Sequence, residues 1–307
     1  SREHQELAWN QLPEIIDHYR PIGRLADHVA LEVGIEPGQG PLVFPTSDDQ
    51  QAGLVGGGAV DDGQVAVILG NSAVVNSSSK RLPDGDALDV MRLNWGPYLW
   101  MRCYTNGALF LNTVGGGDPD WAELERLGRA CPPGAGGTLV LPFIKSEPSL
   151  EITRDPVPEW FPARPESPGE RYRAALEAIA YLISLGVDAH RQAGQKITRI
   201  TVSGGIARSD LMCEILASVL QSRLERLESD EGPALGAAVT ALAALESHRR
   251  AERGIKEPFT VADAVAILVK YADPVDPNPQ WTGVYQTGLR SFVDRLHQLQ
   301  QKQAEMK

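Results

Sequence analysis

The sequence has few cysteines and little positive charge, and both shortages exclude classes of protein. Its 307 residues include three cysteines, Cys103, Cys131 and Cys213, which lie far apart and form no CxxC pair. This spacing predicts reduced thiols, with no disulfide framework and no zinc site. The 29 Lys and Arg residues face 40 Asp and Glu residues, for a formal net charge of −11. We therefore expect neither a nucleic acid nor an anionic membrane as a partner.

Long apolar runs and the common catalytic signatures are also missing. No apolar stretch reaches the length of a membrane-spanning helix, and the polar start SREHQELAWN does not have the pattern of a signal peptide. The expected location is the cytoplasm. No Walker loop, HExxH or GxSxG occurs, and the glycine runs do not fit the dinucleotide fingerprint. The histidines are scattered, which predicts surface or helix-end positions: His4, His18, His28, His190, His248 and His297.

A strand, a glycine turn and a helix are predicted in succession between Ile197 and Gln221. Apolar, β-branched residues precede Ser203-Gly204-Gly205, and apolar residues at helical spacing follow, with Ser209 or Asp210 as the N-cap. Glycines let a base or a phosphate approach the backbone, and a helix N-terminus favours anions. The pattern is typical of a nucleotide cradle, although an ordinary structural turn has the same sequence.

A pair of carboxylates follows a short apolar strand predicted at residues 41–44. Asp48 and Asp49 open a small-residue helix with glycines at positions 53, 56, 57 and 58. The end of a strand is a favourable place to present an acid or a base to a cleft. The alternative is that one aspartate only caps the helix. The glycines are costly in a helix, which predicts close packing against them.

A β-hairpin is predicted over residues 64–79. Its tip, Gly70-Asn71-Ser72, offers backbone N–H groups and a hydroxyl that suit a phosphate, although an ordinary polar tip is the simpler interpretation. Further helices are predicted at residues 120–130, from a capping box at Ser167 to about His190, from 232 to 250, from 261 to 271 and from 281 onwards. Short strands are expected at 137–143 and 223–228. The alternation indicates an α/β fold.

Four of these segments, in this order, resemble the FGGY family of carbohydrate kinases, with xylulokinase-like spacing. Asp49–Gly56 (DQQAGLVG) is similar to the stretch that carries the family's catalytic aspartate, and its Asp-Gln-Gln form is closer to the glycerol kinase variant. Leu69–Ser72 resembles the second phosphate loop, Gly204–Ser209 the adenosine loop, and Glu231–Ala238 the helix that closes the second domain across the hinge.

The resemblance implies the ribonuclease H-like actin/Hsp70/sugar-kinase superfold. On this basis residues 1–62 are the remnant of an N-terminal sugar-binding domain, and residues 63–307 are a complete C-terminal ATP-binding domain. Three features depart from the family pattern. The Asp-x-Gly-Thr phosphate loop is missing, Asn71 stands where threonine is usual, and Gly-Glu-Arg-x-Pro is reduced to Ser146-Glu147-Pro148.

The resemblance also implies transfer of the γ-phosphoryl group of ATP to a sugar or polyol hydroxyl, with a ketopentose such as xylulose as the leading acceptor. Glycerol or another polyol stays open, as does a catalytically incomplete fragment or a non-catalytic nucleotide- or sugar-binding module. ATP and Mg²⁺ are the implied cofactors, without an assigned metal ligand, and a homodimer is expected.

Each matching residue takes a role from the resemblance. Asp49 is the implied general base, and Gln50 binds another substrate hydroxyl. The remaining implied contacts are with ATP: Gly70, Asn71 and Ser72 hold the β/γ-phosphates, Gly204, Gly205 and Ile206 line the adenosine pocket, and Ser209 caps the helix beneath it.

Overall fold

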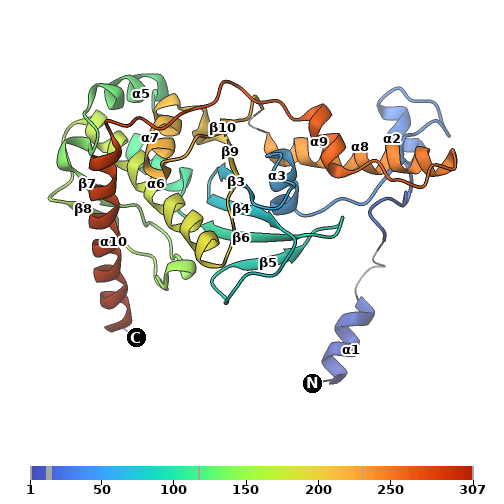
Figure 1. Ribbon diagram of the computed structural model, residues 1–307, viewed down its shortest axis with the longest axis horizontal. Coiled ribbons are helices and arrows are strands. Elements are labelled where there is room, and N and C mark those ends of the chain that lie inside the picture. Colours follow the sequence, from blue (N-terminus) through green and yellow to red (C-terminus); the bar gives the residue numbers. More distant parts are fainter. Residues whose placement is uncertain (1, 12–15, 117, 230, 306–307) are drawn as a thin grey trace.

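The computed structural model describes residues 2–11, 16–116, 118–229 and 231–305. Its centre is a six-stranded sheet in the order β10-β9-β3-β4-β6-β5 (Figure 1). The strands are β3 (Gln64–Leu69), β4 (Ala73–Ser79), β5 (Asp89–Arg92), β6 (Tyr98–Tyr104), β9 (Arg199–Ser203) and β10 (Glu225–Arg226). β10, β9 and β3 run parallel, whereas β3, β4, β6 and β5 form antiparallel pairs.

The predicted hairpin is present, and it gives the sheet two buried faces. β3 and β4 are almost entirely buried, because helices cover the sheet on both sides. Val75 lies against α6, since a Cβ added to Gly186 of that helix would stand 2.8 Å from its Cγ2. On the opposite face, Ile68 approaches Gly53 of α3, and Ala66 approaches Gly57 at the C-cap of that helix. The strand period of two therefore assigns alternate side chains to two separate layers.

One face carries α4 (Ala108–Gly115), α5 (Trp121–Ala130), α6 (Pro168–Gln192), α7 (Asp210–Leu220) and α10 (Thr282–Glu305). α6 begins as predicted: Ser167 Oγ accepts the Glu170 N–H at 3.4 Å, and Pro168 occupies the first helical position. Seventeen residues of α6 are buried, so this long helix lies within the layer for most of its length. This layer contains the largest hydrophobic core.

The other face carries α3 (Asp49–Gly56), α8 (Gly232–Glu252) and α9 (Val261–Leu268). α3 and α8 cross at backbone contact: a Cβ on Gly56 would collide with the Gly232 carbonyl, and a Cβ on Gly236 would collide with the Ala52 carbonyl. The close packing predicted from the glycines is confirmed.

The remaining elements lie at the edges. β7 (Leu139–Leu141) pairs with β8 (Glu159–Phe161), and β1 (Gly23–Arg24) pairs with β2 (Leu42–Val43) near α2 (Asp27–Glu32). α1 (Arg2–Gln11) stands apart from the body in Figure 1. Three short 3₁₀ turns, η1 (Ala135–Gly137), η2 (Pro148–Leu150) and η3 (Gly205–Arg208), complete the described chain. No described helix combines the length and hydropathy needed to span a membrane.

The cysteine and histidine predictions have different outcomes. All three cysteines are free, as predicted. The prediction is wrong for His18, which is 4 % exposed. His190 lies in the last turn of α6, as predicted, and is fully buried. Both nitrogens of His190 face carbonyl oxygens, at 2.8 Å from Gly186 and 3.2 Å from Trp100. The neutral ring has a single N–H, so one of these contacts is a hydrogen bond, and it offsets part of the cost of burying the ring. The side chain of His4 lies outside the described part of the chain.

Candidate active site

A cavity of about 750 Å³ lies where the β3–β4 hairpin meets the turn after β9. Gly70 and Asn71 line it from the hairpin tip, and Gly205, Ile206 and Ser209 line it from the turn. Two segments that are more than 130 positions apart in the sequence thus form one wall, because β3 and β9 are adjacent parallel strands. The other lining residues come from α4 to α7, the end of β3 and η3: Leu69, Ala108, Leu111, Asn112, Trp121, Ala122, Glu125, Tyr172, Arg208 and Asp210.

The hairpin tip is held by the start of α4. The Gly70 carbonyl accepts the Ala108 N–H at 2.9 Å, and the Asn71 carbonyl accepts the N–H groups of Gly107 at 3.1 Å and Leu109 at 3.3 Å. Gly107 has to be a glycine, since a Cβ would stand 2.8 Å from the Gly70 oxygen. With its carbonyls turned to α4, the tip is fixed in place at the cavity.

A buried polar cluster fixes the loop that leads into α4. Asn106 is fully buried; its Oδ1 accepts the N–H groups of Ile144 and Lys145, and its Nδ2 donates to Glu147. Glu147 also accepts the Thr105 N–H at 2.7 Å. Burial raises the pKa of Glu147, and these donors oppose the rise. The shortened Ser146-Glu147-Pro148 motif therefore contributes a carboxylate that supports the hairpin tip.

Gly204, Gly205 and Ile206 of the predicted adenosine loop have different structural roles. Gly204 has φ +94°, and a Cβ there would stand 2.6 Å from the Leu69 carbonyl oxygen, so it lets the turn pass the end of β3. It lines a smaller neighbouring cavity of about 440 Å³. Gly205 is exposed with no atom within 4 Å of an added Cβ, and Ile206 is buried behind it. Both line the larger cavity, where Gly205 has only backbone to present.

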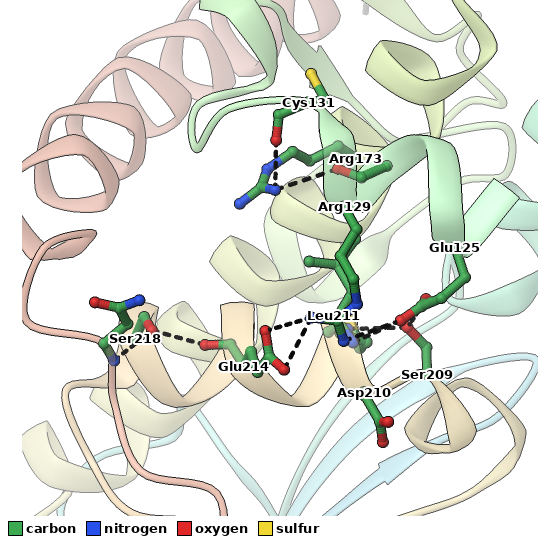
Figure 2. Close-up of polar contacts among 12 residues, drawn as sticks. Glu125, Arg129, Cys131, Arg173, Ser209, Asp210, Leu211, Glu214 and Ser218 are labelled. Atoms are coloured by element: carbon green, nitrogen blue, oxygen red, sulfur yellow. Dashed lines mark hydrogen bonds and ion pairs between the residues drawn. The ribbon is translucent and has the colours of Figure 1, made fainter.

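Ser209 is the N-cap of α7, and its hydroxyl accepts the Met212 N–H at 2.9 Å. Figure 2 shows that Glu125 of α5 reaches the same end: it accepts the Leu211 N–H at 2.9 Å and the Ser209 hydroxyl at 2.6 Å. Arg129 bridges Glu125 and Glu214. The sequence indicated an anion site at this helix terminus. In the structure, a carboxylate of the chain itself occupies it.

The two adjacent aspartates have different surroundings. Asp48 is the N-cap of α3: Oδ1 accepts the N–H groups of Gln50 and Gln51, both at 2.9 Å, and Oδ2 accepts Gln51 Nε2 at 3.1 Å. Asp49 is exposed at the first helical position. Within the described part of the chain, no hydrogen bond or ion pair engages its carboxylate.

Cys103 lies on the strand next to the hairpin, close to its tip. It pairs with Val74 across β4 and β6, two residues along β4 from Asn76, which contacts Gln50, and its thiol is half-buried. Burial raises the pKa of this thiol, and the negative charges of Glu147, Asp89 and Asp49 add to the rise. Gly70 and Asn71 of the hairpin tip line the cavity, while Asn76, on the strand that follows the tip, contacts Gln50, the residue after Asp49.

Gln50, the other predicted substrate residue, is half-buried, and its Oε1 accepts Asn76 Nδ2 at 3.3 Å. The described residues contain no group of three or more His, Cys, Asp or Glu side chains suited to a metal ion. A magnesium ion fits this site only in the way it commonly binds with nucleotides, through phosphate oxygens, water and one or two carboxylates.

Several lining residues were not predicted. Trp121 and Tyr172 form an aromatic pair with ring centroids 6.4 Å apart, and Trp121 is 41 % exposed at the cavity. In the sequence, Trp121 and Glu125 only mark an amphipathic helix. Gly107 has no motif around it. Their roles depend on tertiary contacts, so no local signal identifies them.

The chain was compared with known families and structures. Residues 162–245 match the FGGY family of carbohydrate kinases, C-terminal domain. The xylulose kinase of Haemophilus influenzae is 27 % identical over 239 residues, which cover 75 % of this chain and 47 % of that protein. The chain thus spans about half the length of the curated relatives it matches.

Solved structures show the same fold. The xylulose kinase from Rhodospirillum rubrum has a TM-score of 0.75 at 23 % identity and covers 95 % of this chain and 58 % of its own. The ligand-bound xylulose kinase from Lactobacillus acidophilus has a TM-score of 0.83 at 16 % identity and covers 100 % of this chain and 62 % of its own. The predicted relationship to the FGGY family and the predicted sugar-kinase fold are confirmed.

Proposed function

Starting from this relationship to the FGGY carbohydrate kinases, we propose that the chain is the ATP-binding part of a sugar kinase and carries its catalytic aspartate. The observation that supports this most directly is the position of the hairpin tip. Gly70 and Asn71 line the 750 Å³ cavity, and β4, the strand that follows the tip, contacts Gln50, the residue after Asp49, through Asn76. A phosphoryl group held at the tip would lie between a nucleotide and a base.

The cavity suits a nucleotide. An added Cβ on Gly205 meets no atom within 4 Å, and one on Gly70 meets only the Ser72 oxygen at 3.7 Å, so both backbones are open to a ligand. The purine would lie against Ile206 and the exposed ring of Trp121, and the β/γ-phosphates would take the N–H groups of Asn71 and Ser72. The Gly70 N–H donates to the Ser72 carbonyl at 3.0 Å, so Gly70 contributes by letting a phosphate come close to the backbone. Asn71 supplies an amide where the family has a hydroxyl.

Asp49 is the general base in this proposal, because Asp48 is committed to capping α3 and Asp49 is not. It accepts the proton of the attacking hydroxyl while Gln50 binds another part of the acceptor. Phosphoryl transfer requires mainly positioning and charge compensation, which the fixed hairpin tip provides. Mg²⁺, when bound with ATP, would neutralise phosphate charge, held by phosphate oxygens and water, and we assign it no ligand in this chain.

The acceptor class follows from the relatives. The matches to proteins named xylulose kinase favour a ketopentose such as xylulose, and glycerol or another polyol is the second candidate because of the Asp-Gln-Gln form at Asp49. We also propose residues 1–62 as the sugar-domain remnant and 63–307 as the ATP-binding domain, a cytoplasmic location, and a homodimer.

Calorimetric titration of Mg-ATP, followed by product assays with xylulose and glycerol, tests the proposal on this chain and on the full-length gene product. We expect ATP binding to both and turnover by the full-length product. Failure of both to bind ATP would contradict the nucleotide site, and binding without any sugar phosphorylation by the full-length product would contradict the kinase.

The role of Asp49 is tested by matched variants in the full-length product. Asp49→Asn should lower kcat by about 10²–10⁴-fold, the range typical of general-base catalysis, with ATP affinity unchanged. Asp48→Asn is the control, because asparagine also caps helices, and it should stay within about threefold of wild type. Near-normal turnover of Asp49→Asn would exclude Asp49 as the base.

A further inference from the structure

Asn76 is a fully buried polar residue in the middle of β4, on the sheet face that α3 covers. Its cross-strand neighbours are Ala66 on β3 and Met101 on β6. Both belong to an apolar cluster that includes Leu54 of α3. An amide buried among such side chains is costly unless it is hydrogen-bonded.

The hydrogen bonds of Asn76 converge on one residue. Asn76 Nδ2 donates to both the backbone oxygen and the side-chain Oε1 of Gln50, each at 3.3 Å. Asn76 Oδ1 has no partner among the described residues. The contact therefore connects a central strand to the second residue of α3, immediately after Asp49.

This contact fixes the direction of the Gln50 amide. Since Oε1 is turned to Asn76, the outward group of Gln50 is Nε2, which can only donate. We infer that Asn76 is a positioning residue that presents Gln50 Nε2 to the acceptor substrate, and that the substrate offers it an oxygen acceptor, either carbonyl or hydroxyl. The inference rests on the proposed function and specifies how the site selects its sugar.

The contribution of Asn76 is separated from a general effect on folding by a double-mutant cycle in the full-length product. Asn76→Leu removes the donor with little change in volume. We expect the dissociation constant and KM for the sugar to rise about 10-fold, the scale of one or two lost hydrogen bonds, with KM for ATP unchanged. The rise should disappear when Gln50 is already alanine, because Asn76 acts through Gln50.

The control is Ser78→Ala on the same strand. Ser78 is also buried, and its hydroxyl donates to the Val60 carbonyl at 3.2 Å, away from Gln50. It should leave sugar binding unchanged. If Asn76→Leu does not fold, Asn76→Ala replaces it in the cycle. An equal loss of sugar affinity in the wild-type and Gln50→Ala backgrounds, or no loss of sugar affinity at all, would overturn the positioning role.

The direction of the amide has its own test. Gln50→Glu keeps an oxygen for Asn76 but turns the outward donor into an acceptor, so sugar affinity should fall at least as far as in Gln50→Ala. Wild-type affinity in Gln50→Glu would overturn the assigned direction. A crystal structure of Asn76→Leu tests the positioning role without an activity assay. The side-chain amide of Gln50 should adopt a different orientation from that in the wild type. An unchanged orientation would contradict the inference even if the protein proves not to be a kinase.

Discussion

Residues of the same type act differently at this site because their hydrogen bonds differ. Asp48 receives three donors and fixes the start of α3, while the adjacent Asp49 keeps its carboxylate in solvent. Gly204 lets the turn come close to the backbone at the end of β3, whereas the backbone of Gly205 is exposed at the cavity. In each pair, the residue that remains available to a ligand is the one that does not already make a structural contact within the chain.

Cys103 is a natural reporter of this site. Burial, together with nearby carboxylates, raises the pKa of its thiol, so alkylation should be slow at neutral pH and faster as the pH rises. ATP and sugar together should slow it further, because Cys103 pairs with Val74, two residues after the hairpin tip that would hold the phosphates. Mass spectrometry after iodoacetamide treatment measures this.

Cys131 is the internal control for the reporter. It is also half-buried, its pKa is raised mainly by burial, and it is not among the residues that line the 750 Å³ cavity. Its alkylation should not respond to the ligands. Equal protection of both thiols would indicate a general change in the protein instead of occupancy of the site.

At the scale of elements, the crossing of α3 and α8 holds the proposed base in place. A Cβ on Gly236 would collide with the Ala52 carbonyl, a backbone group that cannot turn aside. Gly236→Ala should therefore cost about 1–3 kcal/mol of the free energy of unfolding, the usual range for overpacking. It should also lower kcat, because α3 carries Asp49. Urea unfolding and steady-state kinetics measure the two effects.

Gly283 provides the matched control for that substitution. It lies in α10 with no atom within 4 Å of an added Cβ, so Gly283→Ala should leave stability unchanged or raise it by up to about 1 kcal/mol through helix propensity. Equal stability of the two alanine variants would mean that the α3–α8 contact can relax.

The elements that the sequence predicts well are those with a strong local pattern. α6 has a cap and helical periodicity, and the β3–β4 hairpin has two apolar runs around a polar tip. β5, β6 and β8 lie in the stretch from 80 to 165, where no clear periodicity distinguishes strand from loop. Asn76 and Glu125 show the same limit at the site, because their partners are distant in sequence and only tertiary packing brings them together.

In the molecule as a whole, a few buried titratable groups have opposite effects on stability. Burial lowers the pKa of His190, so the unfolded chain takes up a proton first as the pH falls below 6.5, and stability is lost. Burial raises the pKa of Glu177 to about 7, although Arg173 opposes the rise. The folded state therefore retains a proton that the unfolded chain releases above about 4.5, and stability is lost as the pH rises toward 7.

These opposite slopes should partly cancel in the wild type between pH 5 and 7, and single variants should separate them. Relative to wild type, the urea midpoint of His190→Gln should increase as the pH falls from 7.5 to 5, because the variant no longer favours protonation of the unfolded chain. The midpoint of Glu177→Gln relative to wild type should increase as the pH rises over the same range, since a neutral amide has no proton to lose. Each variant will also shift the midpoint by a constant amount through lost contacts, so the trend with pH is the relevant measurement. If the differences in urea midpoint between each variant and the wild type stay constant with pH, neither buried group titrates in this range. Trends of the same sign would show that one of the two pKa shifts has the opposite direction.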